Sequence, residues 1–251
     1  AVSGRVTIGS STTLTQTNPA DAITVSGSWF NNGTFNEGTS TVTFIGTGGA
    51  FTINSLGAAD PFHNLTINAA GTTYTLGNAL DVNGNFNFTA GTFNVGGFNI
   101  TASGNWTQAA INTTFIGGTN TVTLDGTGTQ NISGGRFANL TTSSSVAGSN
   151  KSLLNSLTIG GNLIIGTNTI LNAGEQNVNI SGNWTNNVGA GGFTQTGVGC
   201  VYVNGAAQTI GAGATTTFQN LYLAGSGTKI LGFNATVNGN LAISNTLTQV
   251  D

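Results

Sequence analysis

The stretch SGNWT occupies residues 103–107 and returns, letter for letter, at 181–185, and the near-copy SGSWF stands at 26–30. These three copies hold all three tryptophans of the chain, Trp29, Trp106 and Trp184, which lie 77 and 78 residues apart. A short phrase that recurs at a nearly fixed interval is the sequence signature of a repeat architecture. The phrase therefore predicts a repeat unit of about 78 residues.

Three further phrases recur in the same order along the chain. The copies are STVTFIGTG (40–48), NTVTLDGTG (120–128) and CVYVNGAAQ (200–208); FHNLTIN (62–68), FANLTTS (137–143) and FQNLYLA (218–224); LDVNGNFNF (80–88), LTIGGNLII (157–165) and ATVNGNLAI (235–243). We therefore predict one continuous domain over 1–251, with three repeats at about 24–100, 101–178 and 179–251 and a partial repeat at 1–23.

All four phrases share one pattern, a short alternating apolar strand followed closely by Gly. Aligned on that position, the chain shows 13 rungs about 20 residues apart. This spacing is too long for hairpins, whose loops take two to five residues, and it suits one turn of a coil. The pattern predicts an all-β, single-stranded parallel β-helix (a β-solenoid) without substantial α-helix.

Nine residues define the repeat in this prediction: Trp29, Trp106, Trp184, Gly27, Gly104, Gly182, Asn85, Asn162 and Asn240. We expect the glycines to form corners with positive φ, and the asparagines that follow to hydrogen-bond along the stack. The tryptophans are expected to fill or cap the coil at a fixed place. The alternative is a row of tryptophans that stack on sugars.

Composition supports the fold and excludes several partners. Only 4% of the residues are charged, Gly accounts for 40 of 251, and the strong helix formers are scarce. The four basic residues are scattered, which argues against nucleic acid as a partner. No run of about 18 apolar residues exists, so we expect no membrane span. The lone Cys200 excludes an internal disulfide framework, and we expect it to be a small buried residue.

The Gly- and Asn-rich rungs with almost no charge resemble the β-helical repeats of bacterial surface and secreted proteins, of which the filamentous-haemagglutinin type of adhesin is an example. The resemblance covers the whole chain and rests on pattern and composition. It implies an extended shaft, adhesin or fibre at the cell surface or outside the cell.

No constellation of residues predicts catalysis, so we expect no enzyme, no catalytic or metal-binding residues and no cofactor. The seven acidic residues are mostly tens of residues apart, whereas general acid–base chemistry needs two groups at one bond. The single histidine, His63, lies in DPFHNLT beside Asp60 and is expected to be a polar loop residue. Polysaccharide-processing β-helices, which this chain resembles in coil pattern, carry acidic clusters that are not visible here.

Two other binding functions stay open at this point. Ice-binding β-solenoids present Thr-x-Thr ladders, and TLT, TVT and TNT occur here, although the rung spacing of 14 to 23 residues is uneven. Surface glycans are a candidate partner because aromatic residues are scattered along the chain.

The two ends of the sequence carry the same rung type, VSGRVTIGSSTTLTQ at 2–16 and VNGNLAISNTLTQ at 237–249. Neither end shows a polar cap, and the start AVSGRV carries no initiator Met or signal-peptide pattern. We therefore expect a structural fibre that stacks head to tail with copies of itself or continues into neighbouring repeats of a longer chain, with the shaft of a surface adhesin as the alternative. The candidate end-to-end interface comprises Val2, Val6, Ile8, Val237, Leu241 and Ile243.

Overall fold

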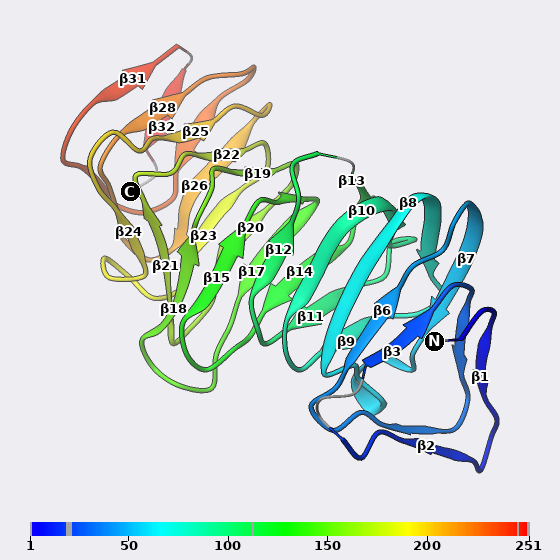
Figure 1. Cartoon of the computed structure of the whole chain (residues 1–251). Coiled ribbons are helices and arrows are strands. Elements are labelled where there is room, and N and C mark those ends of the chain that lie inside the picture. Colours follow the sequence, from blue (N-terminus) through cyan, green and yellow to red (C-terminus); the bar gives the residue numbers. More distant parts are fainter. Residues whose placement is uncertain (1, 19–21, 112, 245, 250–251) are drawn as a thin grey trace. The chain divides into compact units, whose positions relative to one another are not determined.

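The computed structural model describes residues 2–18, 22–111, 113–244 and 246–249. The chain is an all-β parallel β-solenoid of about 11 turns with about 21 residues per turn. The described residues contain one short helical element, the 3₁₀ turn η1 (Gly57–Ala59). Within each part of the chain, Figure 1 shows strands of successive turns lying side by side as parallel arrows.

The chain divides into two compact units, Ala1–Thr121 and Val122–Asp251, so the boundary lies inside the second predicted repeat. The strands of the first unit are β1 (Val6–Ile8), β2 (Thr13–Thr15), β3 (Ala22–Val25), β4 (Trp29–Asn31), β5 (Thr34–Asn36), β6 (Thr41–Phe44), β7 (Gly49–Asn54), β8 (Asn64–Leu76), β9 (Leu80–Val82), β10 (Phe86–Asn94), β11 (Ile100–Ala102), β12 (Trp106–Gln108) and β13 (Thr113–Ile116).

Strand β14 (Thr121–Leu124) spans the boundary. The strands of the second unit are β15 (Gln130–Ser133), β16 (Arg136–Phe137), β17 (Asn139–Thr142), β18 (Ser149–Leu153), β19 (Leu157–Ile159), β20 (Leu163–Ile165), β21 (Thr169–Gly174), β22 (Val178–Ile180), β23 (Trp184–Asn186), β24 (Phe193–Gln195), β25 (Val201–Val203), β26 (Gln208–Gly213), β27 (Thr216–Phe218), β28 (Leu221–Leu223), β29 (Lys229–Leu231), β30 (Ala235–Val237), β31 (Leu241–Ile243) and β32 (Leu247–Gln249).

The interior consists of columns of apolar side chains, one from each turn. In β6, Val42 and Phe44 point inward while the two threonines face outward, as the alternation of a strand requires. Phe44 pairs with Val25 of the turn before and with Ile67 of the turn after, and all three side chains are fully buried. Stacking apolar side chains on one another in this way fills the narrow core at these positions.

The number of turns differs from the 13 rungs of about 20 residues that the phrases predict, because at three places two consecutive phrases lie on different strands of the coil. The phrases at 67–69 and 82–84 look like successive rungs, yet Ile67 pairs with Phe88. Val82 belongs to another column, where it pairs with Ala102. A gap much shorter than 20 residues therefore marks a change of strand within a turn.

The three tryptophans of the repeated phrase lie inside the coil. Trp29, Trp106 and Trp184 are completely buried and pack against phenylalanines. Trp106 stacks on Phe86 with ring centroids 4.2 Å apart, whereas Trp184 meets Phe193 edge to face at 4.8 Å. Rings without exposed faces offer no platform to a sugar, so this geometry argues against the alternative role in carbohydrate stacking.

The glycine of the repeated phrase is required because a side chain would not fit there, and the prediction that it has a positive φ is wrong. None of Gly27, Gly104 and Gly182 has a φ in the left-handed region. A Cβ on Gly104 would lie 2.3 Å from the carbonyl carbon of Gly84 in the preceding turn, and one on Gly182 would lie 2.3 Å from that of Gly161. Successive corners thus approach too closely for any side chain.

The asparagine that follows each of these corners forms a ladder along the stack. The side-chain oxygen of Asn85 accepts the backbone N–H of Asn105 at 2.9 Å, and that of Asn162 accepts the N–H of Asn183 at 2.8 Å. Each carboxamide therefore satisfies a backbone donor at a corner where the strand ladder is interrupted. Asn240 lies at the far end of such a ladder, with its own N–H donated to Asn220 Oδ1 at 2.9 Å.

The basic residues look scattered in the sequence, but two lysines are buried at equivalent places in the repeat. Lys151 and Lys229 have no exposed surface, and each pairs in register with a glutamine of the preceding turn. Lys151 Nζ donates to the Gly126 carbonyl at 2.5 Å, and Lys229 Nζ donates to the Gly205 carbonyl at 2.7 Å. Burial lowers the pKa of Lys151 to about 8, against a smaller opposing attraction to Asp125.

Candidate functional site: the open end coils

The last described turn of the second unit exposes side chains that the turns before it bury. Leu157, Val178, Val201 and Leu221 form one inward column with Leu241 at its end. The first four are at most 2% exposed, but Leu241 is 49% exposed. Ile243 ends the neighbouring column in the same way and is 45% exposed, although its partner Leu223 is fully buried.

Val237, the third predicted interface residue at this end, is half-buried and pairs with the fully buried Phe218. Strands β30, β31 and β32 are each the last strand of their sheets among the described residues. The outer edge of each strand therefore presents backbone N–H and C=O groups without a partner strand there.

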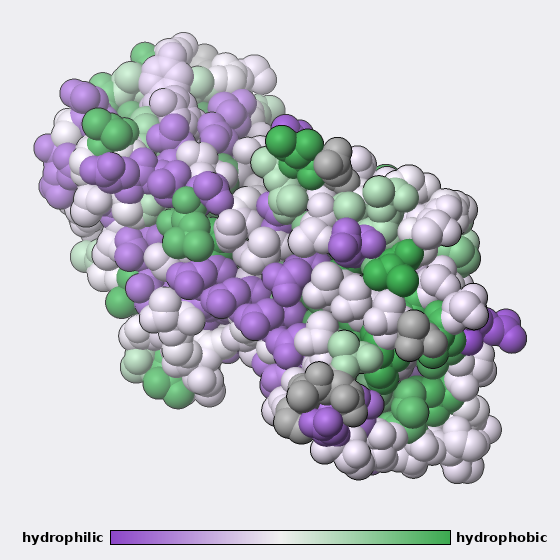
Figure 2. Space-filling view, in the orientation of Figure 1, coloured by the Kyte–Doolittle hydropathy of each residue, from purple (hydrophilic) through white to green (hydrophobic). Residues whose placement is uncertain are grey.

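The first turn of the first unit is open in a similar way. Val2 forms a bridge with the buried Val25 and is 39% exposed, and Val6 pairs with Trp29 and is half-buried. Ile8 differs because it is 4% exposed. A hollow of about 500 Å³ at this end is lined by Val2, Arg5, Val6, Thr7, Ile8, Thr12, Thr13, Leu14, Gln16 and Ile23. Hydrophobic surface gathers over the first strands in Figure 2.

The end coils can form β-sheet pairs and apolar contacts, and their described residues include no acid–base pair. Among the described residues, no group of three or more His, Cys, Asp and Glu side chains could hold a metal ion, and no helix is long and apolar enough to cross a bilayer. Asp60 is buried, accepts the backbone N–H of Phe35 at 2.9 Å and also receives a hydrogen bond from the Asn31 side chain. Its contacts therefore hold a corner of the coil together.

The sequence predicts the same kind of strand for all the end residues, but it does not predict that their exposed fractions differ. The sequence also contains a signal for the buried lysines, namely a shared spacing of the lysines and of their glutamine partners. Lys151 and Lys229 lie one repeat apart, and Gln130 and Gln208, their partners in the preceding turns, are separated by the same interval.

The comparisons add no relative to this picture. The sequence matches no family model, no curated protein and no solved structure. The fold therefore defines the class by itself: the chain is a parallel β-solenoid repeat protein.

Proposed function

We propose that this chain is a structural segment of an extracellular fibre, in which the open end coils pair with further coils of the same kind. The observation that carries the proposal is the exposure of Leu241 and Ile243 at the ends of columns that are buried in all preceding turns. A coil laid on them would remove the exposed half of both side chains from water, which stabilises by about 1 kcal/mol for each. The same coil would continue the backbone ladder.

The end sequences suggest a register for this contact. The stretches VSGRVTI (2–8) and VNGNLAI (237–243) align without a gap. The alignment sets Val237 on Val2, Leu241 on Val6 and Ile243 on Ile8 of the next copy. Such a contact joins two different surfaces, so it propagates along one direction and builds a filament.

Charged residues make up 4% of the chain, so little electrostatic repulsion opposes close stacking of coils. Two further features support the extracellular setting. The repeats resemble those of secreted bacterial adhesins in pattern and composition. The fold is all-β and built from short turns, as the shaft of such a protein requires.

The proposal is tested by assembly of the purified 251-residue chain. We expect electron microscopy to show filaments one solenoid wide, and sedimentation to show growth with concentration. Ile243→Glu should block assembly because it places a charge in the contact, while the melting of the monomer stays nearly unchanged. Ile164→Glu is the matched control, since Ile164 is 37% exposed on an outward face between Thr141 and Thr185.

A covalent trap checks the register. In a Cys200→Ser background, the pair Val6→Cys and Leu241→Cys should form disulfides between copies under oxidising conditions, and Val6→Cys with Ile164→Cys should not. A wild-type chain that stays monomeric at high concentration, or filaments that persist in Ile243→Glu, would contradict the proposal. The shaft of a surface adhesin is the second candidate, and the groove described next is the observation that favours it.

A further inference from the structure

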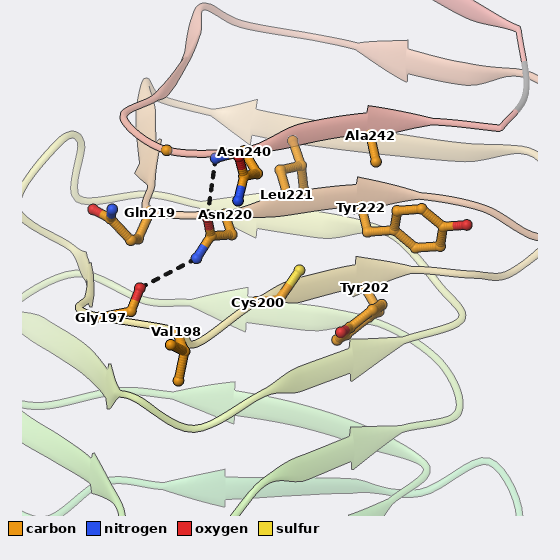
Figure 3. A pocket seen from close by; sticks show the side chains of 11 residues that line it. Gly197, Val198, Cys200, Tyr202, Gln219, Asn220, Leu221, Tyr222, Asn240 and Ala242 are labelled. Carbon is orange, nitrogen blue, oxygen red and sulfur yellow. Dashed lines mark hydrogen bonds between the residues drawn. The ribbon is translucent and has the colours of Figure 1, made fainter.

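A groove of about 690 Å³ runs across the outward faces of the last turns of the second unit, a size typical of ligand sites. Figure 3 shows it between the strands β25, β28 and β31 and the corners before them. Its lining residues are Gly197, Val198, Cys200, Tyr202, Gln219, Asn220, Leu221, Tyr222, Gly239, Asn240 and Ala242.

An interruption of the corner ladder accompanies the groove. Asn177 Oδ1 accepts the backbone N–H of Cys200 at 3.0 Å, but Cys200 has no carboxamide to pass on to the next turn. Asn220, one turn later, instead donates its side-chain N–H groups to the carbonyls of Gly197 at 3.3 Å and Gly199 at 2.8 Å. The small thiol thus stands where neighbouring turns carry a larger amide, and the surface is hollow there.

Two tyrosines form the aromatic wall of the groove. Tyr202 and Tyr222 are partners in adjacent strands, and their rings meet edge to face with centroids 5.7 Å apart. Both are half-buried and outward-facing, and the small side chain of Ala242 follows them in the next turn. The Tyr222 hydroxyl lies 3.1 Å from Ser244 Oγ. These two partly exposed rings differ from the tryptophans of this chain, which are all buried.

The polar groups of the groove are neutral. No lining residue is an Asp, Glu, Lys, Arg or His. Within the described part of the chain, the carboxamides of Gln219 and Asn240 make no hydrogen bond, so both donors and acceptors face the hollow unused. An acidic sugar or a nucleic acid would find no cation to pair with its charges.

We propose that this groove binds a neutral oligosaccharide, with the apolar faces of the sugar rings on Tyr202 and Tyr222 and the hydroxyls on the amides of Gln219 and Asn240. Aromatic faces take up the C–H surfaces of a sugar, and side-chain amides offer a donor and an acceptor to each pair of hydroxyls. The site lies on outward faces of the strands, and its two tyrosines lie one and two turns before the end turn, so the monomer can bind the sugar without end-to-end assembly. Its failure and the failure of the fibre proposal are therefore distinguishable.

The single cysteine provides the readout. Burial raises the pKa of the Cys200 thiol, so alkylation at neutral pH is slow and its rate is read best at mildly alkaline pH. The probes are trisaccharides of β-1,4-linked glucose, of α-1,4-linked glucose and of β-1,4-linked N-acetylglucosamine, with trigalacturonate as the charged control. We expect at least one neutral trisaccharide to slow alkylation of Cys200 and to give a saturable calorimetric isotherm, and trigalacturonate to do neither.

Variants on the groove locate the binding. Tyr202→Ala and Tyr222→Ala should each weaken binding of the active trisaccharide about fivefold or more, whereas Tyr222→Phe, which keeps the ring, should stay within about twofold. Thr158→Ala is the matched control, because Thr158 faces outward in the same column two turns before Tyr202. Tryptophan fluorescence verifies that each variant is folded.

The proposal is overturned if no neutral trisaccharide binds or protects Cys200 at millimolar concentration. It is equally overturned if trigalacturonate binds as well as the neutral sugars, or if binding survives the double variant Tyr202→Ala/Tyr222→Ala in a folded protein.

Discussion

Val203 and Ile243 occupy the same position in the coil two turns apart, yet their surroundings are opposite. Both end an alternating strand and both point inward, with Leu223 between them in register. Val203 is 1% exposed and Ile243 is 45% exposed. In a solenoid each turn contacts only its neighbours, so the burial of a side chain depends on whether a turn lies on both sides. In the described chain, the inward side chains of the interior turns are therefore buried from both sides, whereas those of the end turn are buried from one side.

The largest expected effect comes from placing the same charge at these two positions. Val203→Glu should unfold the second unit, because an unpaired buried carboxylate costs more than about 4 kcal/mol. Ile243→Glu should change the free energy of unfolding of the monomer by less than about 1 kcal/mol, while blocking assembly. Urea unfolding followed by tryptophan fluorescence measures both, and equal losses at the two positions would remove the distinction.

The close approach of successive corners gives the next effect. Gly182→Ala should destabilise by about 2–4 kcal/mol, because its Cβ would lie 2.3 Å from the Gly161 carbonyl carbon and the backbone must move apart. Gly128→Ala is the matched control, since its Cβ would meet no heavy atom within 4 Å and its φ is not positive. Thermal melting of the two variants tests this, and similar melting temperatures would contradict it.

The buried lysine predicts a dependence on pH. The pKa of Lys151 is lowered to about 8 from an ordinary value of 10.5, so the unfolded chain binds more protons than the folded chain between these values. Lys151 should therefore contribute a rise in stability with pH of on the order of 2 kcal/mol between pH 8 and 10, and its contribution should be constant below about pH 7. Lys151→Met should remove this rise, which is measured as the difference between the two urea-unfolding series. A variant with the same slope as the wild type would contradict the assignment.

The smallest effect distinguishes an interior rung of the asparagine ladder from its last rung. Asn162→Ala should cost about 1–2 kcal/mol, because it leaves the N–H of Asn183 without its acceptor. Asn240→Ala should leave the stability of the monomer nearly unchanged and weaken filament growth, since its oxygen has no partner in the described chain. Equilibrium unfolding and sedimentation give the two readouts, and a larger loss in Asn240→Ala would reverse the comparison.

The repeated phrases predicted the fold class because a β-solenoid is built from local patterns. Alternation in stretches such as TVTF assigns one face of each strand to the interior, and the same assignment holds in every turn. The pattern did not predict the number of turns correctly, because the phrases at 67–69 and 82–84 are alike but lie on different strands of the coil. Which strands become neighbours depends on how many residues each corner takes up, and only the folded chain shows this.

The same distinction between sequence pattern and folded structure applies to the candidate sites. The sequence by itself determined that Trp106, Gly104 and Asn85 recur at one repeat interval and that Leu241 and Val6 belong to matching rungs. Tertiary structure alone decided that Gly104 is required for the approach of Gly84, and that Tyr202 and Tyr222, 20 residues apart, meet in one groove. The physical reason is that periodicity fixes the direction in which each side chain points, whereas exposure and contact depend on which turn lies above and below.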